Sequence, residues 1–269
     1  MPSFEFEPEK SYVMPVHFGP MLPGWDGMTV HYERAVGLVF AAPIDPSAVS
    51  PYLPPGFTAS DPAILSVRYL QLSGCIGLAG GGYNVVSVEV SAHFDGEQDH
   101  LEGDYALMQW EGHSAPAIMG RELVGSPKVV ADIPGFWSFG GAKGWHVSEN
   151  STRLAEGEIS QLEKLGEEQA QAISKQFQSR PWLGWKYIPT PDGTGTDVSY
   201  PTSYSKRLNV TEAWSGRGKV RFFETSFEKT PQNNRTSAAL AKLPIPEEGD
   251  AMMVEGSLDL PIYEWRRLK

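Results

Sequence analysis

The stretch "YNVVSVEVSAHF", residues 83–94, determines the fold class that the sequence predicts. Its valines, Val86, Val88 and Val90, alternate with the polar residues Ser87 and Glu89. A period of two is typical of a β-strand with one face on a core. Branched residues such as valine also fit a pleated sheet well. We therefore expect a strand here, with the three valines on one face.

Segments of similar character occur along most of the chain and are separated by glycine and proline. The chain contains 28 Gly and 22 Pro, which suits many short strands joined by turns. The glycine cluster "GLAGGGYN" is interpreted as such a turn, because no helix pattern follows it as a dinucleotide site requires. The further segments predicted as strands are 28–42, 62–72, 104–112, 115–123, 182–189, 206–214, 218–225 and 251–265.

One segment, residues 160–177, has the pattern of a surface helix. Ser160 and Glu163 have the spacing of a capping box, and the apolar residues that follow lie roughly on one face. Pro181 would end the helix.

Together these patterns predict an α+β fold that is mainly antiparallel β. We expect a closed β-barrel-like core with an internal pocket and a few outer helices. No linker or repeat divides the sequence, so we expect one domain over residues 1–269, with residues 1–27 as an N-terminal arm rich in Pro, Gly and aromatic residues.

Charge and composition exclude several classes of function. The formal net charge of −11 makes nucleic acid and anionic membranes poor partners, because both require a basic surface. A single cysteine, and the lack of a signal peptide or a membrane-spanning segment, predict a reduced, cytoplasmic compartment. The acidic and histidine-containing loop at 93–102 is interpreted as solvated, so we predict no metal site and no cofactor.

The segment "GRELVGSPK", residues 120–128, carries the strongest indication of function. Lys128 follows a Gly-Ser-Pro turn and precedes an apolar run, so it is either a solvated turn lysine or a lysine held against a core. A free lysine has a pKa near 10.4, and burial disfavours its charged form. A neutral amine condenses with a ketone to form an imine, which draws electrons from the adjacent carbon bond.

The same segment resembles the G-R-E-x-x-x-x-P-K signature of the acetoacetate decarboxylase-like superfamily. Four further pieces resemble that family in the same order along the chain, and the resemblance covers roughly residues 32–269. These pieces are "GDYALMQWEGHSAPAIMGREL" at 103–123, "RPWLGWKYIP" at 180–189, "VTEAWSG" at 210–216 and "LPIYEW" at 260–265.

The resemblance implies a barrel-like core with an internal pocket, homo-oligomers, and Lys128 as the Schiff-base lysine. In acetoacetate decarboxylase itself such a lysine is activated by burial or by a cationic neighbour. This sequence departs from the decarboxylase pattern at three places. Val129 replaces a second lysine, Val85 holds the place of an acidic residue, and Glu33 holds the place of a substrate-binding arginine.

Candidate residues follow from the resemblance and these departures. Besides Lys128, Glu122 is a candidate acid/base. Tyr263 is a candidate proton donor or water-binding residue, and its alternative interpretation is a residue packed in the core. Arg121 is a candidate carboxylate clamp, although it and Glu122 are equally interpreted as a structural ion pair. The candidates for the replaced substrate-binding residues are Arg34 and Glu89.

The sequence thus predicts a Schiff-base carbon–carbon lyase that acts on small oxo acids. Because the second lysine is missing, a pyruvate aldolase-dehydratase that also takes an aldehyde is favoured over an acetoacetate decarboxylase. A barrel that binds a small molecule without catalysis is the alternative from another class.

Overall fold

A computed structural model describes residues 5–20 and 29–269 of the chain. The predicted N-terminal arm falls partly outside these residues, because positions 1–4 and 21–27 are not described. In the remaining part of the arm, Val16–Phe18 forms one 3-10 turn. No helix in the described part of the chain is long and apolar enough to cross a membrane.

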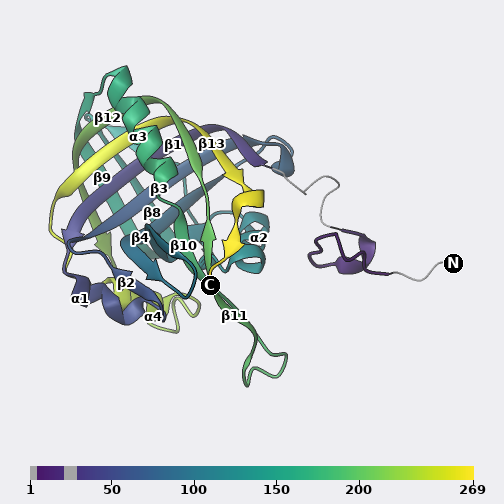
Figure 1. The fold of residues 1–269 in the computed structure, drawn as a ribbon. Coiled ribbons are helices and arrows are strands. Elements are labelled where there is room, and N and C mark those ends of the chain that lie inside the picture. Colours follow the sequence, from purple (N-terminus) through teal and green to yellow (C-terminus); the bar gives the residue numbers. More distant parts are fainter. Residues whose placement is uncertain (1–4, 21–28) are drawn as a thin grey trace.

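One 14-stranded sheet dominates the structure, and all of its pairings but two are antiparallel (Figure 1). The strands are β1 Thr29–Ile44, β2 Phe57–Ala59, β3 Ala63–Cys75, β4 Tyr83–Asp95, β5 His100–Glu111, β6 Lys128–Val130, β7 Trp137–Phe139, β8 Ala142–Glu149, β9 Thr152–Lys164, β10 Trp182–Pro189, β11 Thr196–Tyr204, β12 Arg207–Phe222, β13 Gly249–Pro261 and β14 Arg266–Arg267. The α-helices are α1 Pro46–Val49, α2 Ser114–Val124, α3 Glu167–Ser179 and α4 Asn234–Leu240. The predicted fold class, mainly antiparallel β with few helices, is confirmed.

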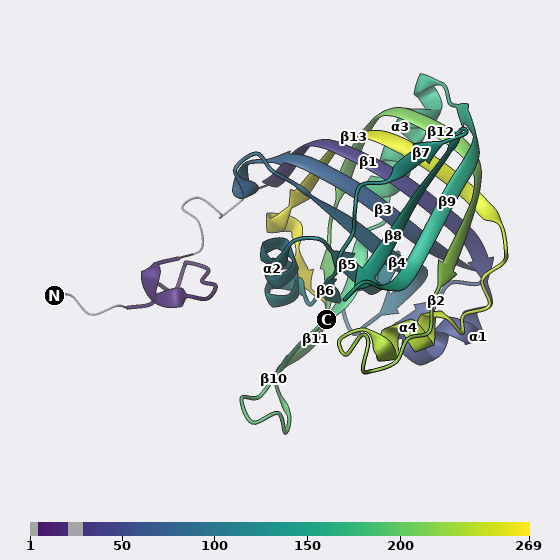
Figure 2. The same ribbon diagram turned by 180° about the vertical axis from the view of Figure 1, so that it is seen from behind.

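The sheet curls, but its strand pairing stays open. The hydrogen-bonded path runs β14-β11-β10-β5-β4-β3-β1-β13-β12-β9-β8-β7, and no pairing among the described residues joins β7 to β14. Figure 2 shows β8 and β9 on the side of the molecule opposite α3. The sheet therefore folds back over one of its own faces, but it does not form the closed barrel that was expected from the sequence.

Strand β4 is buried on both faces, not on one as its alternation suggested. Val86, Val88 and Val90 lie in the larger apolar core inside the curled sheet. Ser87 and Glu89 on the opposite face are also at most 1% exposed. This second face carries a smaller apolar core, to which Ala170 of α3 contributes, and polar side chains further along. Two covered faces mean that polar residues of β4 must find partners inside the protein.

Residues 115–123, predicted as a strand, form helix α2 instead. The Nδ1 atom of His113 accepts a hydrogen bond from the backbone N–H of Ala115, 3.1 Å away, and so caps the N-terminus. Gly125 ends the helix with a left-handed backbone (φ 68°), which glycine adopts without strain. Both capping residues lie outside the apolar run, so the run alone suggested a strand.

The predicted helix at 160–177 begins seven residues later than expected. Ser160 and Glu163 belong to β9, where they pair with Arg217 and Ser215 of β12. Helix α3 starts after Gly166, whose N–H donates to Oε1 of Gln169 at 2.9 Å. Pairing with β12 outweighs the local capping pattern, because it gives residues such as Ser160 and Glu163 backbone partners in the sheet.

Candidate active site

Strands β5 and β6 bring Lys128 beside two buried polar residues. Lys128 pairs in parallel register with Gln109, and Glu111 follows two positions further along β5. Residues two apart in a strand face the same side. Gln109 and Glu111 therefore point away from the larger core, which takes Met108 and Trp110 of the same strand.

The Lys128 ammonium is held by two oxygen atoms. Its Nζ lies 2.7 Å from Oε1 of Glu111 and 3.2 Å from the backbone carbonyl oxygen of Pro116 in α2. The side chains of Lys128 and Glu111 are only 14% and 2% exposed. Lys128 is thus a lysine in an enclosed ion pair, and the alternative of a solvated turn lysine is wrong.

Helix α2 covers this lysine and fixes its backbone. A Cβ atom at Gly120 would lie 2.7 Å from Cε of Lys128, so any other residue here would displace the lysine side chain from its present position. Nη1 of Arg121 donates a hydrogen bond to the carbonyl oxygen of Lys128, at 2.9 Å. The "GRE" and "PK" parts of the sequence motif therefore act together: one supplies space and a backbone contact, and the other supplies the amine.

Two cavities meet at Lys128, and they differ in size and in chemistry. The inner cavity, of about 40 Å³, is lined by Glu111, Ser126 and Trp182 among others. The outer cavity, of about 370 Å³, is lined mainly by apolar side chains such as Ile76. Residues that line both are Tyr83, Gly120, Lys128, Leu260 and Trp265. A molecule bound covalently to Lys128 therefore has room on both sides.

The inner cavity contains polar atoms that lack partners in the protein. Oε2 of Glu111 and Nε1 of Trp182 are both buried without a hydrogen-bond partner. By contrast, Ser126 donates to Oε1 of Gln109 and accepts from the Tyr204 hydroxyl at 3.4 Å. Buried polar atoms without partners are rare in folded proteins and indicate a place where a ligand or water binds.

Two tyrosines, Tyr32 of β1 and Tyr83 of β4, form a pair beside the outer cavity. The hydroxyls of Tyr32 and Tyr83 lie 2.9 Å apart, and both residues line the outer cavity. Burial raises the pKa of both tyrosines above the ordinary value of 10. Both hydroxyls therefore stay protonated at neutral pH and bond to each other.

The structure separates most of the other predicted site residues from Lys128. Glu122 and Arg121 both lie on α2, and neither is among the described residues that line the two cavities. Tyr263 is 55% exposed, and its hydroxyl accepts a hydrogen bond from Arg207. The Arg34 side chain is 64% exposed and pairs with Glu255 at 3.5 Å.

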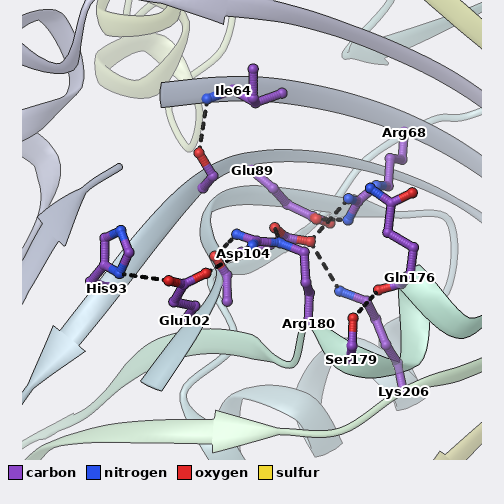
Figure 3. Close-up of polar contacts among 12 residues, drawn as sticks. Ile64, Arg68, Glu89, His93, Glu102, Asp104, Gln176, Ser179, Arg180 and Lys206 are labelled. Carbon is purple, nitrogen blue, oxygen red and sulfur yellow. Dashed lines mark hydrogen bonds and ion pairs between the residues drawn. The ribbon is translucent and has the colours of Figure 1, made fainter. Parts of the chain in front are cut away.

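Glu89 lies on the same face of β4 as Val85, as predicted, but in a different buried site. Its carboxylate contacts Arg68 and accepts a hydrogen bond from Ser87 at 2.6 Å. Figure 3 shows this ionic cluster, in which Asp104 is contacted by Arg68, Arg180 and Lys206, at 3.1, 2.9 and 3.4 Å respectively. The cluster borders a separate surface cavity of about 550 Å³ rather than the cavities at Lys128.

Charges in this cluster compensate one another. The three cations hold the pKa of Asp104 well below its usual range, although burial opposes this shift. Burial, together with the neighbouring Arg68, lowers the pKa of Lys206 to about 7. Lys206 is 1% exposed and is enclosed by the rings of Phe177 and Trp182, so it is a structural group without access for a substrate.

Sequence reasoning missed Glu111, the residue in closest contact with Lys128. The segment "MQWE", residues 108–111, alternates apolar and polar residues, so Gln109 and Glu111 lie on one face. That signal was available, but it also fits a strand with a solvated face. Only the cover provided by β6 and α2 shows that this face is buried.

Solved structures resemble the whole chain in fold. An acetoacetate decarboxylase structure covers 96% of this chain and 95% of its own, with 18% identity and a TM-score of 0.75. The acetoacetate decarboxylase of Legionella pneumophila covers 96% and 93%, with 18% identity and a TM-score of 0.74. The enduracididine biosynthesis enzyme MppR, in complex with pyruvate, covers 95% of both chains, with 15% identity and a TM-score of 0.68.

Sequence comparison is more specific than these fold similarities. No curated protein sequence matches the chain. The family model described as acetoacetate decarboxylase, however, matches residues 13–260, which is most of the chain. The chain therefore belongs to the acetoacetate decarboxylase family.

Proposed function

We propose that this protein is a carbon–carbon lyase that forms a Schiff base between Lys128 and a carbonyl substrate. The observation that carries the proposal is the enclosed Lys128–Glu111 pair, 2.7 Å apart, at the junction of two cavities. An amine beside a carboxylate can pass its proton across the pair and become a nucleophile. Family membership and the relatives of known chemistry support the same class of reaction.

The first step joins the substrate to the enzyme. Proton transfer to Glu111 leaves a neutral amine, whose lone pair attacks the carbonyl carbon. The resulting carbinolamine then loses its hydroxyl group as water, with Glu111 returning the proton, and a protonated imine remains. In this proposal Glu111 has the acid/base role that the sequence analysis considered for Glu122.

An aldol condensation with dehydration follows most directly from these groups. The Glu111 carboxylate removes a proton from the carbon next to the imine, which produces an enamine. The enamine carbon attacks the carbonyl carbon of an aldehyde, and the alkoxide formed takes a proton from Glu111. Glu111 then removes the second proton from the same carbon and transfers it to the new hydroxyl group, which leaves as water. Hydrolysis of the imine releases an unsaturated product and the free lysine.

We favour this reaction over decarboxylation because the site lacks the second lysine of the decarboxylase pattern, at Val129. The small oxo acids implied by the family resemblance are the first carbonyl compounds to test. One MppR structure contains pyruvate, and another contains the condensation product of pyruvate and imidazole 4-carboxaldehyde. We also retain the prediction of a homo-oligomer, which light scattering tests directly.

Borohydride trapping tests the proposed function. The protein is incubated with pyruvate, acetoacetate or acetone, reduced, digested and analysed by mass spectrometry. We expect an adduct on the Lys128 peptide, none in Lys128→Ala, and an unchanged yield in the control Lys219→Ala, which removes an exposed lysine. Absence of an adduct with every carbonyl compound would favour a binding protein, and carbon dioxide release from acetoacetate would identify a decarboxylase.

A further inference from the structure

The outer cavity at Lys128 is suited to an apolar molecule. Its lining includes Val30, Ile76, Leu78, Met119 and Leu123, and Lys128 is the sole charged residue among the described residues that line it. The hydroxyls of its two tyrosines are engaged with each other. A cavity of about 370 Å³ with such a lining binds chiefly through the hydrophobic effect.

The charges at the site are already balanced before any substrate binds. Within the described lining of the two cavities, Lys128 is the one cation and Glu111 the one anion, and they form an ion pair. The two segments outside the described residues, 1–4 and 21–28, contain no lysine or arginine in the sequence. A substrate carboxylate would add a second negative charge without a second cation, which is unfavourable in a buried site.

The arginines that were candidates for a carboxylate clamp do not fill this gap. Arg121 donates to the carbonyl oxygen of Lys128, and the exposed Arg34 pairs with Glu255. Neither belongs to the lining of either cavity. A site for an oxo acid would need a second cation to balance the substrate carboxylate, and the described lining of the two cavities does not provide one.

The two cavity sizes also determine which part of a substrate lies on each side of the imine carbon. The inner cavity, at about 40 Å³, has room for only a few water molecules. It accepts a branch no larger than a methyl or hydroxymethyl group, beside Trp182, whose N–H is buried without a partner. The larger branch must lie in the outer, apolar cavity.

We propose that Lys128 binds an uncharged carbonyl compound, with a methyl- or hydroxymethyl-sized branch in the inner cavity and an apolar body in the outer cavity. This inference rests on the proposed Schiff base at Lys128, and it replaces small oxo acids with uncharged, apolar ketones or aldehydes as the preferred substrates.

A matched pair of ligands tests the inference. 4-Phenyl-2-butanone and 2-oxo-4-phenylbutanoate share the phenylethyl body and differ in having a methyl group or a carboxylate beside the carbonyl. We expect half-maximal borohydride trapping on Lys128 at a concentration at least tenfold lower for the ketone, although the oxo acid is the more electrophilic compound. Acetone, which lacks the body, should require a higher concentration than 4-phenyl-2-butanone.

The outcomes separate this inference from the proposed function. Equal or better trapping of the oxo acid would overturn the inference and leave the Schiff base intact, whereas no adduct from any carbonyl compound would overturn both. Leu260→Arg places a second cation at the junction of the cavities and should shift the preference towards the oxo acid. Melting curves of Lys128→Arg, which keeps the positive charge but cannot form an imine, provide a check without covalent chemistry: the ketone should raise Tm more than the oxo acid does.

Discussion

Gly120 of α2 faces the end of the Lys128 side chain of β6, with no room for a Cβ atom between them. A Cβ atom at Gly120 would lie 2.7 Å from Cε and 2.8 Å from Nζ of the lysine. Both distances are too short for the present lysine conformation, but the obstructed atoms are the flexible end of a side chain. The glycine of the sequence motif therefore sets the position of the amine.

Gly120→Ala is expected to displace the Lys128 side chain without unfolding the protein. Alanine inside a helix is favoured over glycine by about 1 kcal/mol, which offsets part of the steric cost. We predict that borohydride trapping falls about tenfold or more, while the free energy of unfolding changes little. Gly195→Ala, where the new methyl group meets only Thr190 at 3.9 Å, is the matched control and should retain trapping. Normal trapping in Gly120→Ala would contradict this role.

Glu111→Gln is expected to abolish most of the activity. The amide retains the size and one hydrogen-bonding oxygen of the side chain but cannot accept and return a proton. General acid/base catalysis typically contributes about 10²–10⁴-fold, so turnover should fall by at least about 100-fold. Glu102→Gln, on the same strand but with a 65% exposed side chain, is the control. If Glu111→Gln turned over at the wild-type rate, another group would have to move the proton.

Trp182→Phe is expected to weaken ligand binding, while removal of its unsatisfied donor offsets part of the packing that the smaller ring loses against Lys206 and Tyr204. The indole N–H is buried without a partner in the protein, so removing it deletes an unsatisfied donor. If this N–H binds the small branch of a hydroxyl-bearing substrate, such as 1-hydroxy-4-phenyl-2-butanone, half-maximal trapping should require about five- to tenfold more ligand, or roughly 1 kcal/mol.

Trp185→Phe provides the comparison for this prediction. The indole N–H of Trp185 donates to Ser199 Oγ at 3.0 Å, so its removal breaks a satisfied hydrogen bond. Trapping should persist in Trp185→Phe, and stability should fall slightly. Equal trapping by both variants would show that the Trp182 N–H does not touch the ligand.

The buried Lys206 is expected to make the free energy of unfolding depend on pH. Burial lowers its pKa from the ordinary 10.5 to about 7 in the folded protein. Between about pH 7 and pH 10.5 the unfolded chain therefore binds more protons than the folded one, and the free energy of unfolding rises with pH. The contribution of one group is at most about 1.4 kcal/mol per pH unit, and below pH 7 it is constant.

Lys206→Met should remove that rise while Asp104 keeps Arg68 and Arg180 as partners. Urea unfolding at pH 7, 8 and 9 measures the slope below the range in which tyrosines ionise. Lys219→Met, at a 63% exposed side chain, should keep the wild-type slope. An unchanged slope in Lys206→Met would mean that Lys206 remains charged in the folded protein.

Local patterns predicted the strands better than the helices. The segment at 182–189 was predicted with the same bounds as β10, and the segment at 83–94 nearly matches β4. Helix α2 was predicted as a strand because its caps, His113 and Gly125, lie outside the apolar run. The start of α3 was misplaced because the edge of β12 recruits residues 160–164 into the sheet.

The sequence motif of the candidate site could be recognised in advance, but the residues that surround Lys128 could not. Lys128 and Arg121 could be identified because their spacing resembles a family signature. Glu111 and Trp182, which supply the partner and the unpaired donor of the inner cavity, come from strands β5 and β10, 71 positions apart. Neither carries a mark in the sequence that distinguishes it from an ordinary strand residue.

The sequence by itself determined the strand-rich fold class, the family and the lysine of the family motif, because alternation and motif spacing are local properties of a chain. Tertiary structure decided which faces are covered and which charges meet. Whether Glu89 or Glu111 contacts Lys128, and whether a second cation lies near them, depends on pairing between distant strands. Electrostatic interactions act over a few ångströms in space, and a linear pattern specifies such distances only after the sheet has formed.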